Sequence, residues 1–309
     1  MGEHSICVTG LPDSGKTTFI AALVCLLDKG GYEGWSLRDT GNDEYLQKIA
    51  EKWYRCEEMG HTKTKHKENV SFQLENPELD ELLTLQMSDR AGEFFRMNVR
   101  TEEDEAELKD IITNSNQILL FVNPDQVERQ PLLGTMQQEL EKVGIVLDLD
   151  TRSETKASVS EADDKGSSEA DGQDNEQNND SKKKLLFHPG ENAEHAALLQ
   201  TLLDAVGRWE KLRLSVIVSA WDNYKDDKTN TPEKVIKEDI PLFWNVLTAN
   251  RNRLDITFWG VSAQGCNWKN EKERDDMLSI DDIRKRVILV DDQGKPFDNI
   301  MRILIGNGD

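Results

Sequence analysis

A short glycine loop constrains this chain more than any other stretch: residues 10–17 have the sequence GLPDSGKT. They match the pattern G-x-x-x-x-G-K-T, in which N–H groups of a tightly curled backbone bind phosphate oxygens. An apolar run at 5–9 precedes the loop and another at 18–27 follows it. A phosphate-binding loop requires this order of strand, loop and helix, whereas a chance match in a glycine turn does not. The pattern therefore predicts a strand at 5–9, a phosphate site and a helix at 15–28.

Each residue type in the loop has a chemical task. Gly10 and Gly15 allow the backbone to curl tightly, and the start of the helix adds the positive end of its dipole. Lys16 would reach the β- and γ-phosphates of a nucleotide, and the Thr17 hydroxyl would bind Mg²⁺. The predicted nucleotide contacts of this stretch are Gly10, Asp13, Ser14, Gly15, Lys16, Thr17 and Thr18.

Segments with the patterns of strands and helices alternate along most of the chain. Alternating apolar residues at 70–74 and 83–87 predict a strand pair, and apolar runs at 117–122, 214–219 and 255–260 predict buried strands of a parallel sheet. Helices are predicted at 43–58, 102–114, 191–210, 232–250 and 296–306. We therefore predict an α/β fold of the P-loop NTPase type, with three α/β/α layers, a mostly parallel central sheet and one antiparallel edge strand.

The chain has 309 residues, and we predict a single domain over 1–309 with one insertion. Residues 151–184 consist almost entirely of polar and charged residues and contain almost nothing that can enter a core. This composition predicts a disordered insertion. It is either a tolerated surface insertion or a tether that binds a partner.

The net charge of −21 disfavours non-specific binding to nucleic acid and to anionic membranes, and no specific nucleic-acid partner is predicted. The stretch 63–67, KTKHK, is either a local basic patch or a solvated loop, and we favour the loop. The cysteines, Cys7, Cys25, Cys56 and Cys266, lack the spacing of a zinc site. No secretory signal is visible, and the run at 18–27 is too short to cross a bilayer. These features predict a cytoplasmic protein without a membrane span.

A second motif, D-x-x-G, places Asp89 and Gly92 just after the predicted strand at 83–87. An aspartate at this position can hold Mg²⁺, commonly through water, and the Gly92 N–H can meet a γ-phosphate. Thr62 or Thr64, in the polar segment before the strand pair, is expected to close over Mg²⁺ and the γ-phosphate; we favour Thr64 slightly. That neither threonine is a ligand stays open.

A third group of residues follows the later strands. Asp222 ends one predicted strand, where a carboxylate can accept hydrogen bonds from guanine N1–H and the 2-amino group. Ser262 and Ala263 end the next strand, where a backbone N–H can meet guanine O6. In an open α/β sheet, ligands bind at the carboxyl ends of the strands, so these residues are predicted to lie beside the phosphate loop.

Taken together, the motifs resemble those of the translation-factor-like class of P-loop GTPases. The ordered set is GLPDSGKTTF at 10–19, DRAGE at 89–93, SAWD at 219–222 and FWGVSAQG at 258–265. More narrowly, the chain is similar to the bacterial double-GTPase families predicted to act in prokaryotic conflict systems. The resemblance covers most of the chain outside 151–184.

The resemblance implies phosphate and Mg²⁺ roles for Lys16 and Thr17, a second switch at Asp89 and Gly92, and base recognition by Asp222. It also shows departures. Ser219 and Ala220 replace the Asn and Lys of the usual N-K-x-D motif, so the lysine stem that packs on the base is absent. Trp221 either stacks near the base or belongs to the core.

Glu93 stands where many GTPases have a water-orienting glutamine. It either orients or deprotonates the attacking water or is a solvated turn carboxylate. Arg90 and Arg96 are candidates for an internal arginine finger, which a partner can also supply.

The leading hypothesis is a Mg²⁺-dependent enzyme that hydrolyses GTP to GDP and phosphate and acts as a switch for protein partners. Lys16, Glu93 and Thr64 are its predicted catalytic residues, and Thr17, Asp89 and Thr64 its predicted metal ligands. An ATPase of the same fold and a nucleotide-binding scaffold without significant hydrolysis are the alternatives. The sequence does not indicate the partner, the pathway or the oligomeric state.

Overall fold

The computed structural model describes most of the chain outside its central third. The described residues are 2–28, 32, 34–38, 43–59, 70–87, 109–127, 191–206, 211–225, 227, 229–267 and 269–306. All of them belong to one compact unit, which comprises Met1–Glu128 and Pro189–Asp309. The segment 151–184 lies outside the described residues, so the predicted insertion and the single-domain assignment stay predictions.

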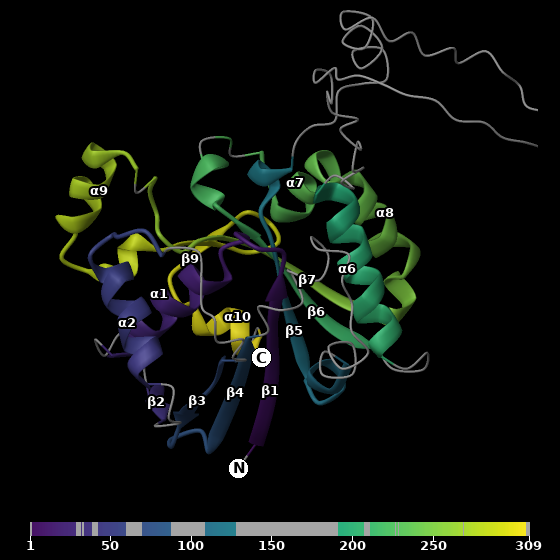
Figure 1. Cartoon of the computed structure of the whole chain (residues 1–309), viewed down its shortest axis with the longest axis horizontal. Helices are drawn as coiled ribbons and strands as arrows, with labels where there is room; N and C mark the ends of the chain where they lie inside the picture. Colours follow the sequence, from purple (N-terminus) through teal and green to yellow (C-terminus); the bar gives the residue numbers. More distant parts are fainter. Residues whose placement is uncertain are drawn as a thin grey trace, which may run out of the picture. The chain divides into compact units, whose positions relative to one another are not determined.

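The described strands form one sheet. Their bounds are β1 Gly2–Gly10, β2 Ser36–Arg38, β3 Val70–Asn76, β4 Glu81–Met87, β5 Gln117–Val122, β6 Leu212–Ser219, β7 Leu254–Ser262, β8 Ile288–Val290 and β9 Pro296–Phe297. Their order across the sheet is β2-β3-β4-β1-β5-β6-β7-β8-β9 (Figure 1). The strand that leads into the glycine loop, β1, therefore lies inside the sheet.

The centre of the sheet is parallel and both margins are antiparallel. Strands β4, β1, β5, β6 and β7 run in the same direction. The antiparallel pairs are β2 with β3, β3 with β4, β7 with β8 and β8 with β9. The mostly parallel sheet is confirmed, although antiparallel pairing extends beyond the one predicted strand. Parallel neighbours bring their carboxyl ends to one edge, and the predicted nucleotide residues follow those ends.

Helices cover both faces of the sheet (Figure 1). The α-helices are α1 Lys16–Asp28, α2 Asp43–Tyr54, α6 Glu191–Ala205, α7 Pro232–Asp239, α8 Pro241–Ala249, α9 Glu271–Leu278 and α10 Met301–Ile305. Short 3-10 turns are η1 Pro124–Gln126, η2 Trp221–Asn223, η3 Arg251–Arg253 and η4 Ile283–Arg286.

Two clusters of buried apolar side chains join the helices to the sheet. One contains residues of α1, α2 and α10, among them Phe19, Leu46 and Trp53. The other contains residues of α6, α7 and α8, among them Leu199 and Phe243. Burial of apolar surface is the dominant favourable term in folding, and each helix layer obtains it against one face of the sheet. The predicted three-layer architecture is confirmed.

Several predicted helices have different bounds in the structure. The helix predicted at 43–58 ends at Tyr54 as α2, and the helix predicted at 191–210 ends at Ala205 as α6. The helix predicted at 232–250 is broken into α7 and α8 because Pro241 has no N–H to donate and disfavours a helical Ile240 before it. The helix predicted at 296–306 is shorter, since Pro296 and Phe297 form β9 before α10 begins. The helix predicted at 102–114 is described only from residue 109, where 109–113 are helical.

Four short elements, β2, α9, β8 and β9, were not predicted. Helix α9 shows why: none of its residues is buried, so its sequence lacks the apolar periodicity that signals a helix. It is started by Asn270, whose side chain accepts hydrogen bonds from the N–H groups of Lys272 and Glu273. Along the described part of the chain, no helix is both long and apolar enough to cross a bilayer.

Candidate functional site

The glycine loop is tightly curled between β1 and α1. Gly10, Asp13 and Gly15 have positive φ values of 152°, 61° and 91°. A Cβ on Gly10 would lie 2.5 Å from the Phe121 carbonyl oxygen and 2.7 Å from Ser14 Oγ, so only glycine fits there. Successive turns of this kind make a concave backbone that binds anions, and the N-terminus of α1 adds its dipole.

Lys16 folds back onto its own loop. Its side chain is buried, with the residue 3% exposed. The ammonium group donates hydrogen bonds to the carbonyl oxygens of Gly10, at 3.1 Å, and Leu11, at 2.9 Å. The positive charge is therefore held at the loop and is ready to exchange these carbonyl groups for phosphate oxygens.

Ser14 has a polar atom that suits a phosphate ligand. Its hydroxyl oxygen is buried and has no hydrogen-bond partner among the described residues. A buried polar group without a partner costs free energy, which a hydrogen bond to a ligand recovers. Thr17, in the first turn of α1, is partly exposed and can offer its hydroxyl to a cation. The loop residues thus suit a bound phosphate group, and the Thr17 hydroxyl could serve as one ligand of a Mg²⁺ ion.

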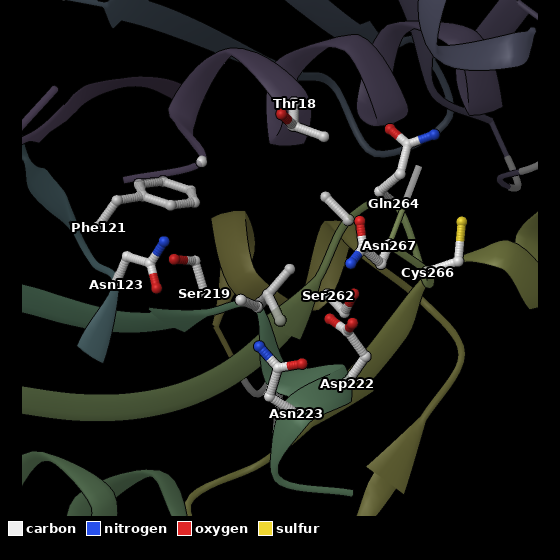
Figure 2. Close-up of a pocket in the computed structure, with 14 residues that line it drawn as sticks. Thr18, Phe121, Asn123, Ser219, Asp222, Asn223, Ser262, Gln264, Cys266 and Asn267 are labelled. Atoms are coloured by element: carbon white, nitrogen blue, oxygen red, sulfur yellow. The ribbon is translucent and has the colours of Figure 1, made fainter. Parts of the chain in front are cut away.

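A cavity of about 310 Å³ opens beside the loop, at the carboxyl ends of β5, β6 and β7 and the start of α1 (Figure 2). We call it the strand-end cavity. Five of the predicted nucleotide residues line it: Gly15, Thr18, Asp222, Ser262 and Ala263. Its volume lies at the lower end of the range for small-ligand pockets. Residues from three distant parts of the sequence thus meet at one site, as their positions after strands predicted.

Asp222 reaches the strand-end cavity through a sharp turn after β6. Ala220 has the left-handed φ of 53° and ψ of 38°, and η2 begins directly after it. The carboxylate end of Asp222 points toward the interior of the cavity (Figure 2). Carboxylate oxygens accept hydrogen bonds but cannot donate them when ionised, so this wall selects ligands with N–H or O–H groups.

Ser219 joins the two halves of the site. Its hydroxyl donates a hydrogen bond to the Val122 carbonyl oxygen at the end of β5. A Cβ on Gly15 would lie 3.2 Å from Ser219 Cβ, so the glycine loop packs directly on this serine. The residue that replaces the usual asparagine therefore holds β5, β6 and the loop together.

Side-chain amides that the sequence analysis missed also line the strand-end cavity: Asn123, Asn223, Gln264 and Asn267 (Figure 2). Asn267 is oriented by the Lys269 N–H, which donates to its Oδ1 at 3.1 Å. The sequence could have indicated Asn123 by its position, because it directly follows the buried strand β5, and Asp222 likewise comes soon after the end of β6. The amides add donors and acceptors to a lining that also carries the Asp222 carboxylate and the hydroxyl groups of Thr18, Ser219 and Ser262.

Trp221 belongs to the core. It is 2% exposed, and its ring lies 5.5 Å from that of Tyr224. The ring occupies a slot that Gly260 leaves open: a Cβ on Gly260 would lie 2.4 Å from the indole. Of the two roles that the sequence left open for Trp221, the structure supports core packing, and the anchored indole holds the neighbouring Asp222.

Gly260→Ala is expected to destabilise the protein by about 1–3 kcal/mol, because the added methyl group overpacks the Trp221 slot. Urea denaturation measures the change. Gly2→Ala is the matched control, since a Cβ on Gly2 meets nothing within 4 Å. Equal unfolding midpoints for the two variants would contradict the close packing of Trp221.

A family model matches residues 7–303, almost the whole length of the chain, and its description is Double-GTPase 1. The chain belongs to the double-GTPase 1 family. Because it belongs to this family, the protein is a GTP-binding protein of the GTPase class. GTPases are nucleoside triphosphate hydrolases. The expected resemblance to double-GTPases is confirmed.

Solved GTPase structures are more distant. The GDP complex of the Sar1 GTPase from Encephalitozoon cuniculi is 11% identical, with 85% of this chain and 70% of that chain covered and a TM-score of 0.35. The GTP-bound Ski7 GTPase-like domain from S. cerevisiae is 12% identical, with 87% and 45% covered and a TM-score of 0.36. No curated protein matches the chain. At TM-scores this low, the family membership rests on the match over 7–303.

The predicted switch and water-handling residues and the two candidate arginine fingers lie outside the described residues, so nothing in the structure tests them. They are Thr62, Thr64, Asp89, Arg90, Gly92, Glu93 and Arg96. The strand that precedes Asp89 is described: β4 pairs in parallel with β1, and Met87 stands opposite Val8. The D-x-x-G motif thus follows the strand next to the one that carries the glycine loop, while the roles of its residues stay predictions.

Helix α6 places an unexpected histidine near the loop. His195 is 3% exposed, and its Nδ1 has no hydrogen-bond partner among the described residues. Burial, together with the positive charge of Lys16, lowers the pKa of His195 to about 3. The imidazole is therefore neutral at pH 7.

We expect His195 to make this double-GTPase less stable as the pH falls. Its pKa is about 3 when folded and about 6.5 when unfolded, so below pH 6.5 the unfolded chain binds a proton that the folded chain rejects. The resulting loss approaches about 1.4 kcal/mol per pH unit. Urea denaturation at pH 7, 6 and 5 should therefore give a shallower pH dependence for His195→Leu than for the wild type.

His4→Gln is the control, because His4 is exposed. It should leave the pH dependence unchanged. If the free energy of unfolding falls with pH equally steeply for His195→Leu and the wild type, His195 takes up a proton in the folded protein over the same pH range as in the unfolded chain.

Proposed function

We propose that the chain binds GTP with Mg²⁺, hydrolyses it to GDP and phosphate, and acts as a nucleotide switch for protein partners. One observation carries the proposal: the strand-end cavity joins the end of the glycine loop and the start of α1, at Gly15 and Thr18, to the carboxylate of Asp222. A nucleotide needs a phosphate site and a base site side by side, and this arrangement supports the proposal that the loop serves as the first and Asp222 as part of the second.

Guanine suits the base site better than adenine. Guanine presents N1–H and a 2-amino group on one edge, and the Asp222 carboxylate can accept both hydrogen bonds. Adenine presents a lone pair at N1 and no 2-amino group, so it would leave the carboxylate without donors. Sites built to hydrogen-bond one ligand reject analogues that lack the partner groups.

The phosphate site neutralises charge on the γ-phosphate. Lys16 would leave the Gly10 and Leu11 carbonyl groups and donate to the β- and γ-phosphates, while the Ser14 hydroxyl gains a partner. Thr17 would hold Mg²⁺, which supplies further positive charge at the phosphates when bound.

The switch residues complete the proposed mechanism. Asp89 and Thr64 would add to the Mg²⁺ site, and the Gly92 N–H would sense the γ-phosphate. Glu93 stands at the motif position of the water-orienting glutamine and would orient the attacking water. Loss of the γ-phosphate would release both segments from their ligands, which changes the surface offered to a partner. A cytoplasmic location and a bacterial conflict system are the proposed setting, the latter from the family resemblance.

Titration of the nucleotide-free protein with labelled GTP and labelled ATP, both with Mg²⁺, tests the proposal. We expect GTP to bind at least tenfold more tightly, which corresponds to about 1.4 kcal/mol. If ATP binds as tightly as GTP or more tightly, the proposed role of Asp222 is contradicted and the alternative, an ATPase of the same fold, is favoured. Phosphate release is measured in parallel, because tight GTP binding without turnover would identify a scaffold.

A further inference from the structure

The turn that follows β7 is bonded to a helix from the other end of the sequence. Trp53, in α2, donates its indole N–H to the carbonyl oxygen of Ala263 at 2.7 Å, although the residues are 210 positions apart. Trp53 is 1% exposed, so water does not compete for this bond. A short, buried hydrogen bond of this kind restricts the orientation of the acceptor peptide.

The peptide so held forms part of the strand-end cavity. Ala263 and Gln264 both line the cavity, and Trp53 does not. In a trans peptide the C=O and the next N–H point in opposite directions. Because the Ala263 carbonyl group points to Trp53, the Gln264 N–H points away from the indole, and both residues of this peptide line the cavity.

A second set of contacts ties the same turn to α2. The Gly265 N–H donates to Ser262 Oγ at 3.1 Å, which closes the turn. Gly265 has a φ of 73°, and a Cβ there would lie 2.1 Å from the Arg286 carbonyl oxygen. Arg286 in turn donates to the Tyr54 carbonyl oxygen at 2.8 Å. The end of α2 and the turn 262–265 are thus joined at two points.

Another tryptophan shows that core packing alone does not require the indole bond. Trp259 lies in the same apolar cluster as Trp53 and is 3% exposed. Its indole N–H has no hydrogen-bond partner among the described residues. The bond from Trp53 is therefore a specific feature of the turn that follows β7.

We propose that Trp53 is a positioning residue for base recognition. Its indole holds the Ala263–Gln264 peptide so that the Gln264 N–H donates to the exocyclic oxygen of guanine. Adenine carries an amino group at that position, which would face the N–H donor to donor. The inference rests on the proposed function: Asp222 recognises one part of the base edge and the turn held by Trp53 recognises the oxygen.

The test compares Trp53→Phe with Trp259→Phe, a matched change that removes an indole N–H for which the described part of the chain offers no hydrogen-bond partner. Affinities for labelled GTP and ATP are measured for both variants and the wild type. Trp53→Phe should bind GTP about tenfold more weakly, as expected for one lost hydrogen bond, and ATP within about twofold of the wild type. Trp259→Phe should keep the wild-type ratio.

Leu46→Ala separates positioning from a general loss of stability. Leu46 is a fully buried residue of α2 that belongs to the apolar cluster. It should lower the melting temperature and leave the GTP-to-ATP affinity ratio unchanged. A ratio lowered as much as in Trp53→Phe would show that any weakening of α2 has this effect and would overturn the proposal.

A measurement on the wild type covers the case in which Trp53→Phe does not fold. The chain has seven tryptophans, whose indole N–H resonances can be assigned by NMR. The Trp53 resonance should shift when GDP binds and stay in place with pyrophosphate, which fills the phosphate loop without a base. An unchanged resonance with saturating GDP would overturn the proposal.

The outcomes distinguish this inference from the proposed function. A wild-type protein without preference for GTP would overturn both. A wild-type preference that Trp53→Phe retains would overturn the role of Trp53 alone and leave Asp222 as the base-recognition residue.

Discussion

Replacement of Lys16 by alanine is expected to weaken GTP binding by about 100-fold or more and to reduce hydrolysis below detection, because charge-assisted hydrogen bonds to the phosphates are lost. The ammonium group is already held at the loop by the carbonyl oxygens of Gly10 and Leu11. GTP titration and phosphate release measure the two effects. The affinity for ATP should fall by the same factor, since the proposed role of Lys16 is to contact the phosphates and not the base.

Lys48→Ala is the control for Lys16→Ala, because Lys48 is exposed on α2. It should bind GTP as the wild type does. The unfolding midpoint of Lys16→Ala must be measured too, since the variant also loses two hydrogen bonds inside the loop. A folded Lys16→Ala protein with wild-type GTP affinity would exclude the glycine loop as the phosphate site.

Asp222→Ala is expected to lower GTP affinity by about 100-fold and leave ATP affinity nearly unchanged, so the preference for GTP disappears. The reason is that two donors of guanine lose a charged acceptor. The same titrations measure the result. Loss of affinity for both nucleotides would instead indicate that the change damages the cavity as a whole.

Asp222→Asn is the matched variant, because the amide has the shape of the carboxylate and carries a donor. GTP should bind this variant weakly, because the amide N–H₂ and the 2-amino group of guanine are both donors and would face each other. Xanthine has a carbonyl oxygen in place of that amino group, so xanthosine triphosphate should bind Asp222→Asn more tightly than GTP does. If GTP still binds better than xanthosine triphosphate, Asp222 does not contact this edge of the base.

The phosphate loop could be predicted from the sequence because its physics is local. The positive φ values at Gly10 and Gly15, the lysine and the start of α1 all lie within one short stretch. The position of Asp222, Ser262 and Ala263 at one cavity could be predicted because parallel strands bring their carboxyl ends to one edge, and each residue lies at or just after such an end. Their roles in base recognition stay predictions. Those inferences needed only the order of the elements.

Other parts of the site depend on contacts that no local pattern carries. Trp221 was open between two roles until the slot beside Gly260 placed it in the core. His195 showed no sign of a connection to Lys16, because they lie on different helices. The short strands β8 and β9 lacked the length and alternation from which strands are predicted.

The sequence by itself therefore determined the phosphate loop, the layered α/β fold and the carboxylate at the end of β6, since glycine conformation, apolar periodicity and strand order act over short stretches. Only the tertiary structure decided how the walls of the strand-end cavity are held. The bond from Trp53 to Ala263 spans 210 residues, and Gly15 meets Ser219 across the sheet. Such contacts form between residues that are far apart in the sequence. They depend on how helices and strands pack together, and no short sequence pattern encodes that packing.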